Sequence, residues 1–214
     1  MSDAPLAGVV ADRLAMVAER IEAARRRSTR AADQVRILPV TKGFDVAVVR
    51  AAAAAGCTEV GENYAQELER KATAAAEEGL EMQWHMIGGV QRNKVRRIAE
   101  LVSCWHTVDR LSLGEAIAAR SPGTAVMVQC NLSSEPHRPG CALEEVDTLV
   151  AQLAEVDLEV IGLMGVAPLG PPEDARPGFR ALVDRAEALA LPERSIGMSG
   201  DLEVAVEEGA TLVR

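Results

Sequence analysis

The chain has 214 residues, of which 48% are hydrophobic and 26% are charged. This balance is ordinary for a globular protein with one sizeable core, and it excludes wholesale disorder and fibrous repeats. A formal net charge of -9 and an aromatic content of 2% argue against nucleic acid and anionic membrane surfaces as partners.

The sequence carries no sign of membrane insertion or export. No apolar run approaches the roughly 20 residues that a spanning helix needs, and no basic segment precedes an apolar block at the start of the chain. The cysteines contain no Cys-x-x-Cys pair, and they are Cys57, Cys104, Cys130 and Cys141. We therefore expect a cytoplasmic protein with buried, reduced thiols, in preference to one with a metal or disulfide site.

The expected elements begin with an amphipathic helix. Its apolar stripe, at helical spacing, consists of Leu6, Val9, Val10, Leu14, Val17 and Ile21. Short runs of Val, Ile, Leu and Met then predict strands that are buried on both faces. These runs cover residues 35–41, 58–61, 83–87, 101–108, 124–131, 158–165, 194–199 and 210–214. Helical patterns fill the intervals, over residues 45–55, 66–78, 93–100, 113–120, 143–156, 177–190 and 201–208.

Local signals mark several helix ends. Ser112 and Glu115 have the spacing of a capping box, which would start a helix. Gly56, Gly79 and Gly209 follow helical patterns and are predicted to end them.

Eight strand runs alternating with helices predict an α/β fold, a (β/α)8 TIM barrel with an extra N-terminal helix. An open, doubly wound sheet is the alternative. Either fold makes residues 1–214 a single domain, with the Pro- and Gly-rich residues 168–178 as a long loop. Because the last strand run ends at Arg214, we expect the natural chain to continue with a short C-terminal tail.

Lysine is scarce, with only Lys42, Lys71 and Lys94 among the 23 Lys and Arg residues. Lys42 ends the first strand run, and the carboxyl ends of barrel strands are where active sites are built. A lysine beside an apolar core is partly desolvated, which makes its amine available as a nucleophile toward aldehydes. The alternative is a lysine whose amine simply extends into solvent.

Other polar residues also fall at carboxyl ends of predicted strands. Asn63 follows the second run, His85 lies in the third, and Arg214 ends the eighth. Ser199 and Gly200 lie in a turn after the seventh run, where backbone N–H groups suit a phosphate. Each has an ordinary structural alternative, such as a helix cap for Asn63 or Ser199 and a satisfied core histidine for His85. Together, an amine, a phosphate cradle and a cation match the needs of pyridoxal 5'-phosphate (PLP).

Several motifs, taken in order, carry a family resemblance. They are Ile37 to Lys42, Val60 to Tyr64 with Gln66 and Glu67, Trp84 to Gly88 with Gln91, Asn93 and Lys94, His106 to Asp109, and Met198 to Glu203. In these residues the chain resembles the pyridoxal phosphate homeostasis protein family. Members of that family have the barrel of fold-type III PLP proteins, as in the N-terminal domain of alanine racemases.

The resemblance implies roles for six residues. Lys42 would form the Schiff base with PLP, Ser199 and Gly200 would hold its phosphate, and Arg214 would face its pyridine nitrogen. The remaining two pocket residues would be Asn63 and His85. An arginine at the pyridine nitrogen does not keep that nitrogen protonated, which weakens the cofactor as an electron sink.

These expectations favour a monomeric PLP carrier or buffer in intracellular PLP homeostasis, without substrate turnover and without a metal. The protein partners implied by that role are PLP-dependent apoenzymes. One alternative is an amino-acid racemase-like enzyme, which needs a second proton-transfer group, and Tyr64 is the one tyrosine available. Another is a phosphate-binding barrel that does not use PLP.

Overall fold

The structure is a computed structural model, which describes residues 4–133, 135 and 137–214. Within these residues, eight strands form one parallel sheet in the order β1-β8-β7-β6-β5-β4-β3-β2. The strands are β1 (Arg36–Ile37), β2 (Glu59–Glu62), β3 (Gln83–Met86), β4 (Val102–Val108), β5 (Ala125–Asn131), β6 (Glu159–Val166), β7 (Glu193–Ser195) and β8 (Leu212–Val213).

Backbone contacts between β2 and the segment that follows β1 close the sheet into a ring. Val40 and Gly61 form an isolated parallel bridge, and the Thr41 N–H donates to the Gly61 carbonyl at 3.0 Å. The short length of β1 follows from Pro39, which has no N–H to contribute to a ladder. The closed ring confirms the predicted TIM barrel, and the open sheet offered as an alternative is wrong.

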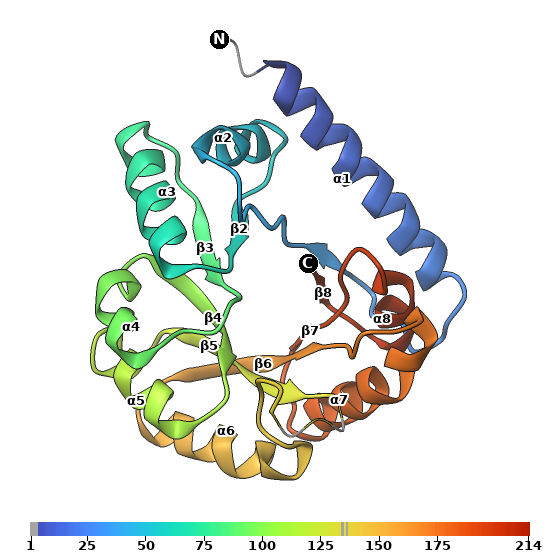
Figure 1. The fold of residues 1–214 in the computed structure, drawn as a ribbon. Coiled ribbons are helices and arrows are strands. Elements are labelled where there is room, and N and C mark those ends of the chain that lie inside the picture. Colours follow the sequence, from blue (N-terminus) through green and yellow to red (C-terminus); the bar gives the residue numbers. More distant parts are fainter. Residues whose placement is uncertain (1–3, 134, 136) are drawn as a thin grey trace.

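Helices surround the ring of strands (Figure 1). They are α1 (Ala4–Arg25), α2 (Val46–Ala54), α3 (Ala65–Glu77), α4 (Arg92–Ile98), α5 (Leu111–Ala118), α6 (Val146–Glu155), α7 (Arg176–Ala188) and α8 (Leu202–Glu208), with 3-10 turns η1 (Leu143–Glu145) and η2 (Pro172–Ala175). Each of α2 to α8 follows a strand, and α1 precedes the first one. The expected extra N-terminal helix is therefore confirmed.

Helix α1 lies along the outside of the barrel and packs on α2 and α8 (Figure 1). Ile21 and Ala24 near its end are buried in the main core. The predicted apolar stripe explains this packing only in part, because Val9 is 55% exposed. The part of the stripe that precedes Ile21, including Val9 and Val10, faces a cavity that is described below.

The core has two parts. The larger part lies between the strands and the surrounding helices, and Trp105, Phe179 and Leu68 are among its fully buried side chains. A smaller cluster is made of five residues contributed by different parts of the ring, namely Leu38, Cys104, Met127, Met164 and Leu212.

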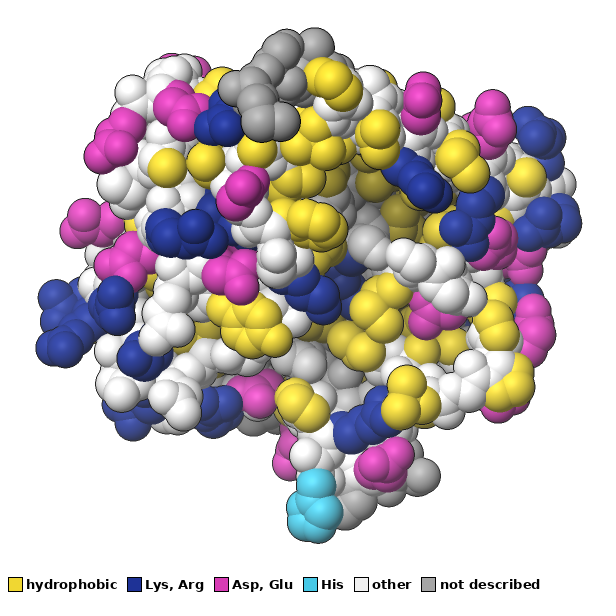
Figure 2. Space-filling view, turned by 45° about the horizontal axis from the view of Figure 1, so that its top comes forward, with side chains coloured by type: hydrophobic (Ala, Val, Ile, Leu, Met, Phe, Trp, Pro, Cys, Tyr) yellow, Lys and Arg dark blue, Asp and Glu magenta, His cyan; other side chains and the backbone are white. Residues whose placement is uncertain are grey.

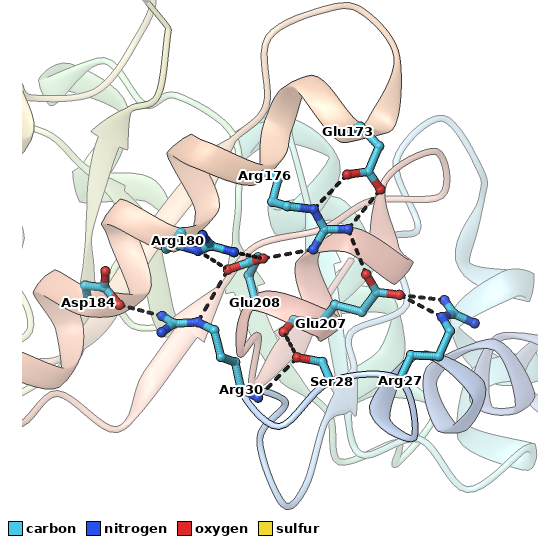
Figure 3. A network of polar contacts seen from close by, with 9 residues as sticks. All are labelled: Arg27, Ser28, Arg30, Glu173, Arg176, Arg180, Asp184, Glu207 and Glu208. Atoms are coloured by element: carbon cyan, nitrogen blue, oxygen red, sulfur yellow. Dashed lines mark hydrogen bonds and ion pairs between the residues drawn. The ribbon is translucent and has the colours of Figure 1, made fainter.

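An ion-pair network joins the segment after α1 to α7 and α8 (Figure 3). The Glu208 carboxylate is almost fully buried and accepts hydrogen bonds from Arg176 and Arg180 at 2.8–2.9 Å, while Arg30 lies 3.4 Å away. The hydrogen bond from Arg180 lowers the pKa of Glu208, so this carboxylate is ionised at neutral pH. The network fixes α8, which directly follows the turn discussed below.

The helix ends predicted by glycine are confirmed, whereas the predicted helix start is wrong. Gly56, Gly79 and Gly209 follow helices with φ of 86°, 72° and 112°, which confirms them as helix ends. The capping box at Ser112 is wrong, because α5 begins at Leu111 and Arg110 occupies the N-cap.

The long loop predicted over residues 168–178 also needs correction, because it contains η2 and the first residues of α7. All four cysteines are free, and all but Cys57 are buried. Within the described residues, no helix has both the length and the apolar character needed to cross a membrane.

Candidate functional site

A cavity of about 610 Å³ opens at the carboxyl ends of the strands, between the barrel mouth and α1. Figure 2 shows a hollow edged by hydrophobic side chains, with Lys and Arg side chains inside it. Its lining is Val9, Val10, Arg13, Leu14, Val17, Arg20, Ile37, Leu38, Pro39, Val40, Thr41, Lys42, Val48, Ala52, Asn63, Ile87, Val166, Met198, Ser199, Leu202, Val213 and Arg214.

The charge of this lining differs from that of the whole chain. The chain carries a formal charge of -9, yet among the described residues the lining contains four cationic residues and neither Asp nor Glu. The four are Arg13 and Arg20 from α1, Lys42 from the segment between β1 and α2, and Arg214 after β8. Such a concentration of positive charge in a concave site attracts a small anion.

Lys42 projects from a tight turn just beyond the first strand. The Phe44 N–H donates to the Thr41 carbonyl at 3.2 Å and closes the turn, in which Gly43 has a φ of 78°. Glycine adopts this conformation without strain, and it leaves Lys42 at the tip. Lys42 is exposed rather than partly desolvated as expected, because the turn carries it past the strand end.

A buried ion pair holds both sides of this turn. The Lys71 ammonium is fully buried and donates to the Thr41 carbonyl and to Glu62 Oε1, both at 2.6 Å, and to Glu67 Oε2 at 3.1 Å. Glu67 in turn accepts the Gly43 N–H at 2.8 Å, and these contacts lower the pKa of its carboxyl group. Lys71 therefore fixes the backbone on either side of Lys42.

Asn63 reaches the cavity from the end of β2, and its backbone presses against the end of β3. A Cβ atom added to Gly88 would lie 2.0 Å from the Asn63 carbonyl oxygen. Only glycine can therefore occupy position 88 without moving Asn63. Tyr64, which follows Asn63, is 58% exposed and does not line the cavity.

The turn before α8 brings Ser199 to the cavity. Asp201 Oδ1 accepts the Met198 N–H at 2.6 Å, and the Asp201 N–H donates to the Met198 carbonyl at 3.1 Å. Arg20 from α1 donates to the Ser199 carbonyl at 3.1 Å and pairs with Glu203. Gly200 belongs to the same turn, although it does not line the cavity itself.

Arg214 contributes a firmly held guanidinium. Its Nη1 donates to the carbonyl and hydroxyl oxygens of Ser195 at 2.5 and 2.8 Å, and its Nη2 donates to the Gly165 carbonyl at 3.0 Å. Burial lowers the pKa of Arg214 from 12.5 to about 10, which still leaves it charged at neutral pH.

His85 does not reach this cavity. It lies in β3 with 5% exposure, where Nδ1 is 2.9 Å from His106 Nε2 and Nε2 is 3.2 Å from Glu59 Oε2. The structure thus brings Lys42, Asn63, Ser199 and Arg214 together and places His85 in the barrel interior.

No pattern in the sequence predicted the cations of α1 at the cavity or the buried support of the Lys42 turn. Arg13 and Arg20 lie on the side of α1 that faces the cavity. Arginines on a surface helix are ordinarily solvated, so the sequence did not mark these two as cavity residues. Lys71 was singled out only by the scarcity of lysine. The four-residue spacing between Glu67 and Lys71 was the available signal for their pairing.

A family model described as "Alanine racemase, N-terminal domain" matches residues 13–214. A chain titled alanine racemase from Clostridium difficile shares the fold, with a TM-score of 0.68 at 12% identity, and the match covers 95% of this chain and 55% of that one. The fold and the site therefore define an alanine racemase-like barrel.

Two curated relatives are more similar in sequence. The pyridoxal phosphate homeostasis protein of Pseudomonas aeruginosa is 37% identical, over 96% of this chain and 92% of its own. That of Aquifex aeolicus is 36% identical, over 95% and 93%. PipY of Synechococcus elongatus, solved with PLP bound, has a TM-score of 0.78 at 28% identity and covers 96% of both chains. The chain belongs to the family of pyridoxal phosphate homeostasis proteins.

Proposed function

We propose that this protein binds PLP in the cavity and carries or buffers it for PLP-dependent apoenzymes, without turning over a substrate. The observation that carries the proposal is the charge of the lining, which in the part of the chain that the structure describes is cationic and free of Asp and Glu, in an acidic protein. PLP is a small dianion with an aldehyde, so it matches both this charge and the amine of Lys42. The PipY structure, whose title states that PLP is bound, supports the same ligand.

The residues present fit the parts of this ligand. When bound, PLP supplies an aldehyde that condenses with a primary amine to give a Schiff base and water. All three lysines lie in the described residues, and only Lys42 lines the cavity, whereas Lys71 is buried in ion pairs. We assign Lys42 Nζ as the condensing amine.

The remaining parts of the ligand would meet the other lining residues. Ser199 and Gly200 lie in a turn before a helix, where N–H groups can hold a phosphate, and Arg20 adds a cation beside it. Arg214 would donate to the pyridine nitrogen. Asn63, which also lines the cavity, offers an amide. The free cysteines are consistent with work in the reducing cytoplasm.

The position of Tyr64 favours binding over racemisation. A two-base racemase needs a second proton-transfer group facing the substrate carbon. Tyr64 is the sole tyrosine of the chain, is 58% exposed and lies outside the cavity lining. The described residues thus offer no tyrosine for this role.

The test is an absorbance titration of the purified protein with PLP. We expect a visible, yellow band in the wild type and in Lys94→Ala, and its loss in Lys42→Ala. A band that persisted in Lys42→Ala would contradict the assignment of Lys42. Racemisation of alanine by the yellow protein, abolished by Lys42→Ala, would replace the carrier function with an enzymatic one.

A further inference from the structure

A continuous series of polar contacts crosses the barrel interior from β2 to the residue after β8. Glu59 Oε2 lies 3.2 Å from His85 Nε2, and His85 Nδ1 lies 2.9 Å from His106 Nε2. His106 Nδ1 lies 3.1 Å from Ser195 Oγ, which accepts from Arg214 Nη1 at 2.8 Å. The series, here called the interior relay, uses five residues from five positions around the ring.

The middle of the relay is buried beside an apolar cluster, whereas Glu59 at its far end also accepts from the exposed Arg36 at 2.8–2.9 Å. His106 and Ser195 are fully buried and His85 is 5% exposed. The neighbouring interior cluster consists of hydrophobic residues, including Leu38, Met127 and Leu212. Buried polar side chains cost free energy unless they are hydrogen-bonded, and an apolar interior of the same shape would be at least as stable. The relay therefore calls for an explanation other than stability.

The two ends of the relay fix the direction of its first and last hydrogen bonds. A guanidinium can only donate, so Arg214 donates to Ser195 Oγ, and a carboxylate can only accept, so Glu59 accepts from His85. The hydrogen bond from His85 lowers the pKa of Glu59, and burial lowers the pKa of His106 well below 6.5. Glu59 is therefore ionised and His106 neutral at pH 7.

With these ends set, the contacts between them can form hydrogen bonds that all run in one direction. In this arrangement the Ser195 hydroxyl accepts from Arg214 and donates to His106 Nδ1, so His106 carries its proton on Nε2. That N–H donates to His85 Nδ1, so His85 carries its proton on Nε2 as well and donates it to Glu59. All four hydrogen bonds then run from the cation at the mouth to the anion at the other end.

The mouth end of the relay determines which Arg214 protons remain for a ligand. A guanidinium has five N–H donors, and the contacts with Ser195 and Gly165 use three of them. The described residues provide no acceptor for the other two, which are one Nη2–H and the Nε–H. Ser195 Oγ, the last member of the relay, is one of three oxygens that hold the guanidinium, together with the Ser195 and Gly165 carbonyls.

We propose that Ser195, His106, His85 and Glu59 are positioning residues, which hold Arg214 so that its remaining N–H groups face a ring-nitrogen acceptor in the cavity. This inference rests on the proposed function for the identity of that ring, the pyridine of PLP. The direction of the relay is independent of the ligand and can be tested without it.

The first experiment is two-bond ¹⁵N–¹H correlation NMR of the histidine rings in the ligand-free protein. The chain has three histidines, and His137→Gln removes the exposed one from the spectrum. We expect His106 as a neutral ring protonated on Nε2, and a proton on Nε2 of His85. A ring of His106 protonated on Nδ1 would reverse the relay and overturn the proposal.

The second experiment compares PLP with its 1-deaza analogue, which has carbon in place of the ring nitrogen. A hydrogen bond from a charged donor predicts that the wild type binds PLP about tenfold more tightly than the analogue, or more. In Ser195→Ala we expect this preference to fall to about threefold or less, with little change in the affinity for the analogue. Arg214→Met should lose the preference in the same way.

The outcomes separate the inference from the proposed function. A preference that stayed at its wild-type value in Ser195→Ala would show that the relay does not position Arg214. A wild type that bound neither compound would refute PLP binding, and the histidine tautomers would still decide the direction of the relay.

Discussion

Replacing Lys71 with methionine is predicted to be the most damaging single change near the site. Lys71 and Glu62 are both fully buried, and Nζ makes its two shortest contacts, at 2.6 Å, with Glu62 Oε1 and the Thr41 carbonyl. Glu62 Oε2 has no hydrogen-bond partner among the described residues, so the Lys71 ammonium is the main group that compensates the buried negative charge of Glu62. Removing one member of a buried pair leaves an uncompensated charge, which costs about 3–5 kcal/mol.

That loss is large beside a typical free energy of unfolding of about 5–15 kcal/mol. We expect Lys71→Met to lower the urea midpoint followed by circular dichroism, and to lower the melting temperature by roughly 10 °C. The Lys42 turn should also loosen, with a weaker visible band at a given PLP concentration. Lys94→Met is the matched control, because Lys94 is half-buried and has no ion pair in the described part of the chain, and it should change stability by less than about 0.5 kcal/mol.

A double-mutant cycle measures the interaction energy between Lys71 and Glu62. Glu62→Gln removes the charge that Lys71→Met strands, so the double variant should lose less than the sum of the single losses, by about 1–3 kcal/mol. A loss below about 1 kcal/mol in Lys71→Met, or additive losses in the cycle, would refute the account of the buried pair.

Two further predictions concern pH and close packing. Because the folded protein lowers the pKa of His106, the unfolded chain takes up a proton below about pH 6.5 that the folded chain does not. The free energy of unfolding should therefore fall as the pH falls, by up to about 1.4 kcal/mol per pH unit. This slope should be smaller in His106→Gln and unchanged in His137→Gln. Equal slopes in all three proteins would contradict a lowered pKa for His106. Gly88→Ala should displace Asn63, which its new Cβ would approach to 2.0 Å, and should weaken both stability and PLP binding. Gly89→Ala, with open space around its Cβ, should do neither, and equal effects of the two changes in calorimetry would contradict the packing argument.

The strands could be predicted because burial on both faces leaves a simple signature of continuous apolar runs. The run over residues 158–165 became β6 (Glu159–Val166) nearly unchanged. The first run was longer than β1 because periodicity does not register the missing N–H of Pro39. Ser112 has the letters of a capping box, yet the helix starts one residue before it, since the cap is decided by backbone geometry rather than by spacing.

Site residues could be predicted only where a position near a strand end was enough to place the side chain at the cavity. Lys42, Asn63, Ser199 and Arg214 meet at the cavity because parallel strands place their carboxyl ends at one rim. The burial of Lys71 could not be predicted, since its partners come from two other segments. The contact between His85 and His106 likewise depends on the register of β3 and β4, which no local pattern specifies.

Peptide mapping after borohydride reduction identifies the lysine that condenses with PLP. The protein is mixed with PLP, reduced and digested, and the modified lysine is located by mass spectrometry. We predict a phosphopyridoxyl group on Lys42, with Lys71 and Lys94 unmodified, because Lys42 alone of the three faces the cationic cavity. Modification of Lys71 or Lys94 in place of Lys42 would contradict the account.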